Sequence, residues 1–456
     1  MSISIISDME QARATILRRI PFDEVQVSQE MLARTEDLFG ARLTPTEAVQ
    51  MILREVRRHG DEAVKRYTRQ LDGVVTEQLR VSSAELEEGW QATPPTLREA
   101  LQFASDRIRA FHESQPVRPW AMRGENALGQ IIRPLGRVGV YAPGGSVAYP
   151  SSVLMAAVPA RVAGVSEVLL ATPPGRDGRV PPAVLAAARI ARVDAVYKMG
   201  GAQAIAALAY GTESVPRVDK VVGPGNLFVT LAKGQVYGDV GIDGLFGPTE
   251  TMIIADDSAH PQWIAADLIA QAEHDVLASA ILLTPSTDLA LRVQVEVAKQ
   301  LADLPRQDIA VQSLGARGGI VLTESIEQAV ELANEYGPEH LCLALANPAS
   351  WVKRIENAGG IFLGEMSSEA LGDYVIGPSH IMPTGGTARF TSAVNVWDFV
   401  KIINVFDVSD GEVRRISEAA SEIAEAEGLN GHACAIRWRV AGKPSRGVSD
   451  EDTERD

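Results

Sequence analysis

Two side chains near the middle of the chain have the types and the spacing of a metal site. Gln271 and His274 stand three residues apart at the end of a predicted helix, whose body covers residues 261–270 and begins with a proline that a first turn tolerates. Residues three apart lie on one face of a helix, so both side chains can reach a common point. A neutral imidazole is among the commonest metal ligands, whereas an amide oxygen is a weak one. A histidine that caps an ordinary helix end gives the same pattern, so the pair alone leaves both interpretations open.

An acid and an imidazole stand next to each other further along the chain. Glu339 and His340 follow a Gly-Pro turn and lead into a predicted strand over residues 340–346. An imidazole titrates near neutral pH and can serve as a general base, and the mouth of a parallel strand is where α/β proteins place catalytic groups. A solvated pair at an ordinary turn is the alternative interpretation.

Two later loops also combine an acid with an imidazole. Asp373 precedes His380 in a loop rich in glycine, and Glu427 precedes His432 across a Gly-Leu-Asn-Gly stretch. Each pattern suits a binding site, but an Asp-capped turn and a glycine helix cap explain them equally well.

The elements that must position these residues belong to the α/β class. Between residues 138 and 247 short apolar runs alternate with alanine-rich helical stretches, and this alternation predicts a parallel sheet covered on both faces. Three of its strands lead into small-residue turns that carry Tyr141, Gln203 and Asn226. Such turns can bring the backbone close to a phosphate, but glycines also serve plain turn geometry. Nucleotide binding is therefore one of two open interpretations.

A second run of the same kind follows over residues 251–363. We therefore predict two Rossmann-like, doubly wound α/β domains with small helical extensions at the N-terminus and the C-terminus. The predicted division is an N-terminal extension (1–30), a first α/β domain with the candidate metal and catalytic residues (31–130 and 248–384), a second α/β domain (131–247), a C-terminal helical tail (385–442) and a disordered end (443–456).

Composition and charge exclude several classes of protein. The chain has 456 residues and a formal net charge of −16, which argues against a nucleic-acid groove because such grooves need clustered Lys and Arg. No run of about eighteen uncharged apolar residues occurs, so we expect no membrane span. Two cysteines cannot form a disulfide framework, and the N-terminus lacks the basic start of a secretory signal. We therefore expect a cytoplasmic protein without nucleic-acid or membrane partners.

Eight short motifs occur in an order and spacing that resemble the histidinol dehydrogenase family over roughly residues 30–440. They are Tyr141-Ala-Pro-Gly-Gly145, Gly200-Gly-Ala-Gln203, Gly223-Pro-Gly-Asn226, Gly247-Pro-Thr-Glu250, Gln271-Ala-Glu-His274, Gly337-Pro-Glu-His340, Gly372-Asp373 to Thr384, and Glu427 to His432. The resemblance implies a zinc- and NAD-dependent enzyme that oxidises L-histidinol to L-histidine in two steps, through a bound aldehyde. This reaction closes histidine biosynthesis.

The resemblance also implies a role for each candidate residue. One zinc ion per chain would be bound by Gln271, His274, Asp373 and His432. The substrate would be contacted by Thr249, Gln271, His274, His340, Asp373, His380, Glu427 and His432. NAD would be contacted by Tyr141, Gln203 and Asn226 in the second α/β domain. His340 would act as the base in both oxidations, while Glu339 would activate the water that hydrates the aldehyde.

The resemblance further implies an obligate homodimer with shared active sites. The tail over residues 385–442 is too short and too thinly apolar to form a domain of its own, and in the family it reaches across a two-fold axis. Gln271, His274 and Asp373 would then come from one chain, and Glu427 and His432 from the other.

The chain departs from the family pattern at two positions near the predicted site. Phe246 stands where the family usually has alanine, and Thr249 replaces the commoner serine while keeping the hydroxyl. These changes leave open a relative that acts on another small amino or hydroxyalkyl alcohol. A zinc hydrolase that uses Glu339 to activate water and a nucleotide-binding protein without catalysis are further alternatives. Against a hydrolase, the sequence contains no His-Glu-x-x-His motif. A binding protein without catalysis would not explain the pair of Glu339 and His340.

Overall fold

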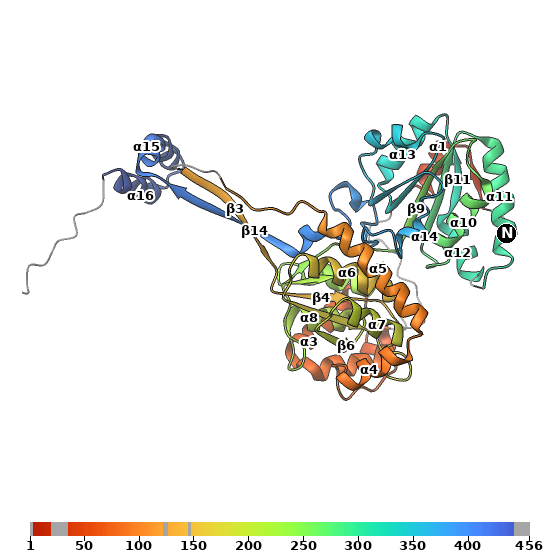
Figure 1. Ribbon diagram of the computed structural model, residues 1–456, viewed down its shortest axis with the longest axis horizontal. Coiled ribbons are helices and arrows are strands. Elements are labelled where there is room, and N and C mark those ends of the chain that lie inside the picture. The colour runs from red at the N-terminus through yellow and green to blue at the C-terminus, as the bar shows by residue number, and fades with distance from the viewer. Residues whose placement is uncertain (1–2, 20–34, 122–125, 145–146, 306, 442–456) are drawn as a thin grey trace, which may run out of the picture. The chain divides into compact units, whose positions relative to one another are not determined.

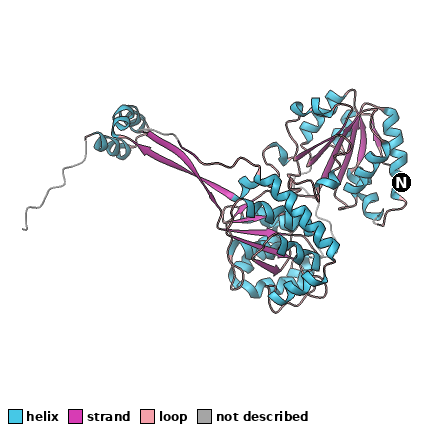
Figure 2. Cartoon of the chain, viewed as in Figure 1, coloured by secondary structure: helices cyan, strands magenta, loops and turns pink. Residues whose placement is uncertain are grey.

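The computed structural model describes residues 3–19, 35–121, 126–144, 147–305 and 307–441. The chain forms two compact units, one of Met1–Gln115 with Pro134–Val400 and the other of Pro116–Arg133 with Lys401–Asp456. The first unit contains two β-sheets flanked by helices (Figure 1), and Figure 2 shows the helices that cover their faces. This arrangement confirms the predicted α/β class. The predicted disordered end, residues 443–456, lies outside the described residues.

Six parallel strands form the first sheet, in the order β1-β11-β10-β9-β12-β13. The strands are β1 (Ile5–Ile6), β9 (Glu250–Ala255), β10 (Ser279–Thr284), β11 (Gly319–Leu322), β12 (His340–Ala344) and β13 (Gly360–Leu363). The accompanying helices are α1 (Met9–Ala14), α10 (Pro261–Ala272), α11 (Thr287–Leu301), α12 (Gln307–Arg317), α13 (Ile326–Tyr336) and α14 (Glu369–Gly372). Successive side chains of a strand point to opposite faces, so Ile253 packs with α10 and α11 while Met252 and Ile254 pack with α13. Both faces are therefore buried, which is why these strands read as continuous apolar runs.

Five parallel strands form the second sheet, in the order β6-β5-β4-β7-β8. The strands are β4 (Arg137–Tyr141), β5 (Glu167–Thr172), β6 (Ala195–Lys198), β7 (Lys220–Val222) and β8 (Gly241–Ile242). The helices between them are α6 (Pro150–Val162), α7 (Pro182–Ile190), α8 (Gly201–Tyr210) and α9 (Leu227–Val236). Leu170 of β5 packs with α6 and α7 on one face, and Leu169 packs with α8 and α9 on the other. The glycine-rich turns after β4, β6 and β7 therefore lie at the carboxyl edge of this sheet.

Helices that precede β4 also cover the second sheet. They are α3 (Pro45–Tyr67), the π-helical turn η2 (Thr68–Asp72), α4 (Ser83–Ala92) and α5 (Pro95–Glu113). Ile52 of α3 belongs to the core face that contains Leu169, and Ile108 of α5 belongs to the opposite face. This packing differs from the predicted grouping of residues 31–130 with residues 248–384. An apolar stripe shows that a helix buries one face, but it does not show which of two sheets covers that face.

The N-terminus contributes a strand as well as a helix. β1 pairs in parallel with β11, and Ile3 and Ala12 are buried in the cores on the two faces of the six-stranded sheet. The sequence predicted a peripheral helix here, because a strand of two residues leaves no periodic pattern.

The second unit contains a three-stranded sheet in the order β14-β3-β2 and a pair of packed helices. Its elements are β2 (Trp120–Ala121), β3 (Asn126–Pro134), β14 (Val400–Val408), α15 (Asp410–Ala426) and α16 (Asn430–Val440). The segment predicted as a helical tail therefore also holds a strand. β14 is exposed along nearly its whole length, so no alternation of buried and exposed positions marks it in the sequence.

Short 3-10 turns complete the description. They are η3 (Pro348–Ser350), η4 (Val352–Arg354), η5 (Thr387–Arg389) and η6 (Val396–Phe399). Within the described ranges, none of the helices combines the length and the apolar character needed to cross a membrane.

Candidate active site

The candidate catalytic residues gather at the amino edge of the six-stranded sheet. His340 is the first residue of β12, Glu250 is the first residue of β9, and Gln271 lies in the last turn of α10. A connecting helix runs antiparallel to the strands beside it, so its carboxyl end reaches the edge where the strands begin. The expectation that the Glu339–His340 pair uses the usual carboxyl-edge position is therefore wrong, because residues that lead into a strand lie at its amino end.

Glu339 is buried and its carboxylate is held on one side. Oε2 accepts hydrogen bonds from Thr249 Oγ1 at 2.6 Å and from the Glu250 N–H at 3.0 Å. Only 6% of the residue is exposed, and this burial raises the pKa of Glu339 well above that of an ordinary carboxyl. A carboxyl group with a raised pKa can accept a proton from water near neutral pH.

His340 is oriented from the same backbone. Its Nδ1 lies 3.2 Å from the carbonyl oxygen of Glu250, which is the geometry of an Nδ1–H donor. Nε2 is buried, lies 3.9 Å from Oδ1 of Asp373, and has no hydrogen-bond partner among the described residues. Burial lowers the pKa of His340, while the Asp373 carboxylate opposes this shift. A neutral ring with its free nitrogen aimed at the site is suited to accept a proton.

His380 connects the loop after α14 to the other sheet. Its Nδ1 lies 2.8 Å from the carbonyl oxygen of Asp373, and its Nε2 lies 3.3 Å from Oγ of Ser152 in α6. Burial lowers the pKa of this imidazole too. Ser152 was not predicted from the sequence, since a serine in an alanine-rich helix carries no signal of its own.

The candidate metal ligands of the first unit have unused coordination capacity. Gln271 is 2% exposed, and no described residue bonds its Nε2. A half-turn of the amide brings Oε1 to the same place, which is the atom a metal would bind. His274 is exposed, and it acts together with Asp373 on the pKa of His340 and of His380, so these side chains share one neighbourhood. One imidazole (His274), one carboxylate (Asp373) and one buried amide (Gln271) fit part of a zinc coordination sphere.

The described residues of one chain do not complete such a sphere. Among them, no group of three or more His, Cys, Asp and Glu side chains is arranged to hold a metal ion. Glu427 and His432 belong to the second unit, where Glu427 caps the end of α15 and His432 stands in the first turn of α16. Both are exposed. Their predicted roles at the metal and the substrate stay predictions.

Two further carboxyl groups, one buried and one half-buried, stand close in sequence to candidate ligands. Glu369 accepts a hydrogen bond from Thr251 Oγ1, and Asp267 accepts one of 3.0 Å from Ser368 Oγ. Burial raises the pKa of both carboxyls. Glu369 stands four residues before Asp373, and Asp267 stands four residues before Gln271. An acid one helical turn before two of the candidate ligands is a signal that could have identified these carboxyl groups in the sequence.

The three predicted cofactor contacts lie around the carboxyl edge of the five-stranded sheet. Tyr141 ends β4, and its hydroxyl accepts a 3.1 Å hydrogen bond from the Gly201 N–H. Burial raises the pKa of Tyr141 to about 12, so the phenol stays protonated. Asn226 caps α9, its Oδ1 accepting from two backbone N–H groups. The turn before it requires glycine, because Gly223 has φ of 126° and an added Cβ would lie 2.1 Å from the Tyr141 carbonyl oxygen.

Gln203 lies beside Asp72, an acid that was not predicted from the sequence. Gln203 is fully buried, its Nε2 lies 3.5 Å from Oδ2 of Asp72, and its Oε1 has no partner within the part of the chain that the structure describes. Asp72 ends the π-helical turn after α3, and its burial raises its pKa to about 6. No local motif singles out this acid.

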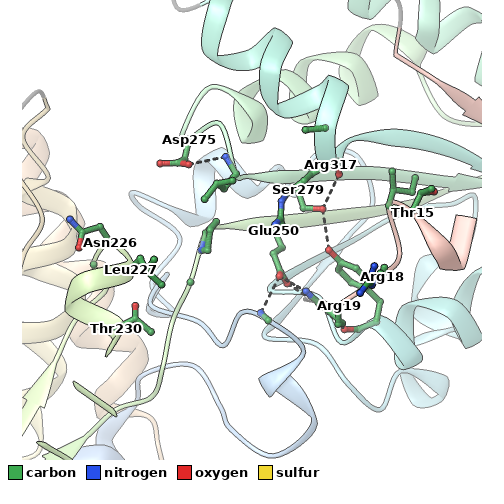
Figure 3. A pocket seen from close by; sticks show the side chains of 18 of the residues that line it. Thr15, Arg18, Arg19, Asn226, Leu227, Thr230, Glu250, Asp275, Ser279 and Arg317 are labelled. Carbon is green, nitrogen blue, oxygen red and sulfur yellow. Dashed lines mark hydrogen bonds and ion pairs between the residues drawn. The ribbon is translucent and has the colours of Figure 1, made fainter. Parts of the chain in front are cut away.

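A cavity of about 460 Å³ lies next to these groups (Figure 3). Its lining joins Asn226 and Leu227 of the first turn of α9 to Glu250 and Ser279 of the six-stranded sheet, and to Arg19 of the N-terminal segment. Glu250, whose backbone bonds both Glu339 and His340, therefore borders the same cavity as Asn226, a predicted cofactor contact. Together, the fold and the site are those of a two-sheet α/β enzyme with a buried pair of an acid and an imidazole.

Comparisons with known proteins identify the family. The profile described as histidinol dehydrogenase matches residues 41–440. The histidinol dehydrogenase of Deinococcus radiodurans is 52% identical over 433 residues, which cover 94% of this chain and 98% of the relative. That of Thermus thermophilus is 52% identical over 404 residues, covering 88% and 96%. A crystal structure of histidinol dehydrogenase from Elizabethkingia anophelis matches with a TM-score of 0.88 at 33% identity, covering 96% of this chain and 98% of that one. The chain belongs to the histidinol dehydrogenase family.

Proposed function

We propose that the chain oxidises L-histidinol to L-histidine in two NAD-dependent steps through a bound aldehyde, as the last steps of histidine biosynthesis. Family membership supports this substrate. The observation that carries the chemistry is the buried Glu339–His340 pair. Glu250 bonds both groups, and His340 Nε2 has no hydrogen-bond partner among the described residues. An alcohol oxidation needs a base of this kind, because the hydroxyl proton must leave as hydride departs from the carbon.

His340 is the proposed base in both oxidations. Its Nδ1 hydrogen bond to the Glu250 carbonyl fixes the tautomer, so Nε2 carries the lone pair. Asp373, 3.9 Å from Nε2, stabilises the imidazolium that forms when the proton arrives. His380, whose Nδ1 lies 2.8 Å from the backbone carbonyl oxygen of Asp373, would face the end of the substrate that becomes a carboxylate.

Glu339 is the proposed base for hydrating the aldehyde. Its Oε2 is occupied by Thr249 and Glu250, which leaves Oε1 to accept a proton from water. The resulting hydrate has a hydroxyl group, so His340 can act a second time. Thr249 keeps the hydroxyl of the commoner serine and uses it to hold Glu339, which supports the same division of roles.

Zinc fits the unused donors at this edge of the sheet. Gln271, His274 and Asp373 of one chain would hold one ion per chain together with the partner's His432. The bound metal would supply a clamp for the imidazole and amine nitrogens of the substrate. The observation that supports this assignment is the buried Nε2 of Gln271, which has no hydrogen-bond partner among the described residues.

NAD fits the carboxyl edge of the five-stranded sheet, with contacts from Tyr141, Gln203 and Asn226. NAD would supply the hydride acceptor, and these residues would orient it. Gln203 supports the assignment, since its buried Oε1 has no partner among the described residues and is free for a ligand.

A homodimer with shared sites fits the second unit. Its elements expose large apolar side chains, among them Phe406 at 75% and Trp438 at 67%. Apolar groups exposed to this degree mark surfaces that another protein covers. Covered by a second copy, this unit would carry Glu427 and His432 to the partner's site.

The two cysteines are free thiols, which supports our assignment to the cytoplasm.

The test is NADH formation from L-histidinol by the purified protein, with and without a chelator. We expect two NADH per histidine formed and loss of turnover when the metal is removed. A panel of other small amino alcohols separates histidinol from the substrate of a relative with altered specificity. Turnover of another alcohol at a higher kcat/KM than histidinol would contradict the proposed substrate.

A further inference from the structure

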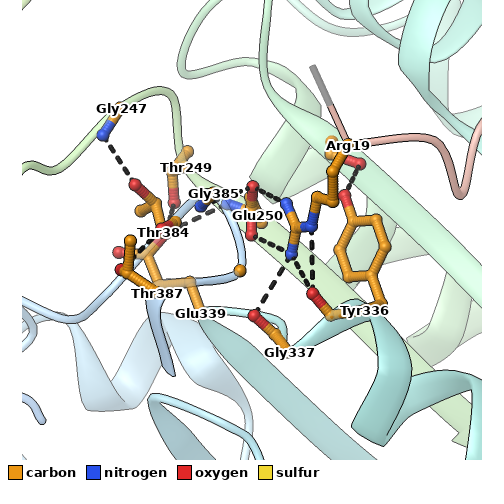
Figure 4. Close-up of polar contacts among 12 residues, drawn as sticks. Arg19, Gly247, Thr249, Glu250, Tyr336, Gly337, Glu339, Thr384, Gly385 and Thr387 are labelled. Carbon is orange, nitrogen blue, oxygen red and sulfur yellow. Dashed lines mark hydrogen bonds and ion pairs between the residues drawn. The ribbon is translucent and has the colours of Figure 1, made fainter. Parts of the chain in front are cut away.

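Arg19 binds the side chain of Glu250 with both ends of its guanidinium group (Figure 4). Nη1 bonds Oε1, and Nη2 bonds Oε2 at 3.0 Å. Such a bidentate pair fixes orientation as well as distance. Arg19 follows α1 in the N-terminal segment, far along the chain from the strand that it binds.

The same guanidinium group also binds the segment that carries the catalytic pair. Nε and Nη2 donate to the Tyr336 carbonyl at 2.9 and 2.6 Å, and Nη2 donates to the Gly337 carbonyl at 3.1 Å. The guanidinium carbon lies 3.4 Å from the centre of the Tyr336 ring. Tyr336 ends α13, and Gly337 forms its left-handed cap two residues before Glu339. Arg19 therefore fixes the point where the chain leaves α13.

Glu250 connects this clamp to both reacting groups. Its N–H donates to Glu339 Oε2 and its carbonyl accepts from His340 Nδ1, while its Oε1 also accepts from the Gly385 N–H at 3.0 Å. A small movement of Glu250 therefore moves the hydrogen bonds of Glu339 and His340 together.

We propose that Arg19 is a positioning residue for catalysis: it holds Glu250 and the end of α13 so that Glu339 and His340 keep their productive orientation. The proposal rests on the proposed function in that Glu339 and His340 perform the acid–base steps. Arg19 itself touches neither of them.

Charge explains why the clamp is needed. Glu250 is buried beside Glu339, and the charge of Glu250 helps to raise the pKa of Glu339. A buried carboxylate without a cation must reach water or take up a proton. Without Arg19, Glu250 would move outward or take up a proton. Outward movement of this first residue of β9 would shift its hydrogen bonds to Glu339 and His340 with it.

The test compares Arg19→Met and Arg19→Lys with the matched control Arg13→Met. Arg13 comes from the same segment and pairs with Glu335 of the same helix α13, but this ion pair is exposed and reaches no catalytic group. All assays are run well below the melting temperature of each variant. We expect Arg19→Met to lower kcat about 10- to 100-fold, with the KM values for histidinol and NAD within about twofold of wild type. Arg19→Lys should recover part of kcat, since it keeps the charge but not the fork.

Hydrogen exchange gives a readout that does not depend on turnover. Amide exchange at Glu250 and Gly385 should rise in both Arg19 variants and stay unchanged in Arg13→Met. Wild-type kcat in Arg19→Met would overturn the proposal, as would equal effects of the Arg13 and Arg19 substitutions. If Arg19→Met does not fold, Arg19→Lys carries the same comparison. Failure of the wild-type protein to form NADH from histidinol would instead contradict the proposed function, while the exchange at Glu250 still tests the clamp.

Discussion

Thr249 Oγ1 donates a 2.6 Å hydrogen bond to Oε2 of Glu339, so the residue that stands where we expected serine holds the carboxylate that we propose as a base. The hydroxyl is the part that the two residue types share. The extra methyl group of threonine therefore leaves the polar geometry unchanged and stiffens the side chain at χ1. The departure does not weaken the assignment of the site.

Glu339→Gln should slow the conversion of aldehyde to histidine more than the oxidation of the alcohol. An amide keeps the shape of the carboxylate but cannot take a proton from water. Burial raises the pKa of Glu339 well above 4.5, and a base works only when deprotonated. The rate of the second step should therefore fall as pH is lowered through a range above that of an ordinary carboxyl. Single-turnover NADH formation from each substrate, measured against pH, checks this, and equal slowing of both steps would contradict the division of roles.

His340→Ala should impair both oxidations, on the order of a hundredfold or more, because a positioned base contributes about that much to each step. KM for histidinol should change less than kcat, since the metal ligands remain. His112→Ala is a matched control, as His112 is also buried and its Nδ1 lies 2.8 Å from the backbone carbonyl oxygen of Ile108 in α5. Alcohol oxidation at the wild-type rate in His340→Ala would remove this residue from the mechanism.

The structure also shows which parts of the site local sequence can predict. The helix body predicted over residues 261–270 is observed as α10, Pro261–Ala272, because its apolar stripe and its proline are local signals. The strand after Glu339 was predicted over residues 340–346 from a continuous apolar run, which is also a local signal, and it is observed as β12, His340–Ala344. These elements position residues whose types were already informative.

Groups that act through the backbone or across long separations leave no such signal. Glu250 holds the catalytic pair with its N–H and carbonyl, which every residue except proline has. Arg19 is 231 positions from Glu250, and Ser152 is 228 positions from His380. Only the fold brings these pairs together, so single-sequence reasoning could not find them.

Asp72→Asn should stabilise the cofactor-free protein at neutral pH. The folded pKa of Asp72 is about 6, above the ordinary value of 3.8. The folded state therefore binds the proton more tightly than the unfolded state, and this contribution to stability is present below about pH 3.8 and lost as pH rises through 6. Partial exposure reduces the effect to on the order of 1 kcal/mol in the free energy of unfolding. Urea unfolding should show the gain at pH 7.5 and none at pH 3.5, whereas a gain of equal size at both would indicate another cause.

His274→Ala should lose zinc, because removing a ligand costs far more than the packing of an exposed imidazole. Wild-type protein should contain about one zinc per chain by mass spectrometry, and a chelator should abolish its turnover. His260→Ala is the matched control, since His260 caps the opposite end of α10 and bonds Glu365. Full zinc occupancy and a normal rate in His274→Ala would remove the Gln271–His274 pair from the metal site.

Chains with different lesions should complement each other if each active site uses two chains. We propose mixing His340→Ala chains with His432→Ala chains, which place one lesion in each unit, and refolding them together. In a mixed dimer with shared sites, one site would carry both lesions and the other neither. Random equal mixing makes half of the dimers mixed, and each has one intact site, so about a quarter of wild-type activity should return. The matched control mixes His340→Ala with Glu339→Gln, two lesions of the same unit, and should form histidine no faster than either variant alone. If His432 served its own chain, every site would keep one lesion and both mixtures would stay inactive.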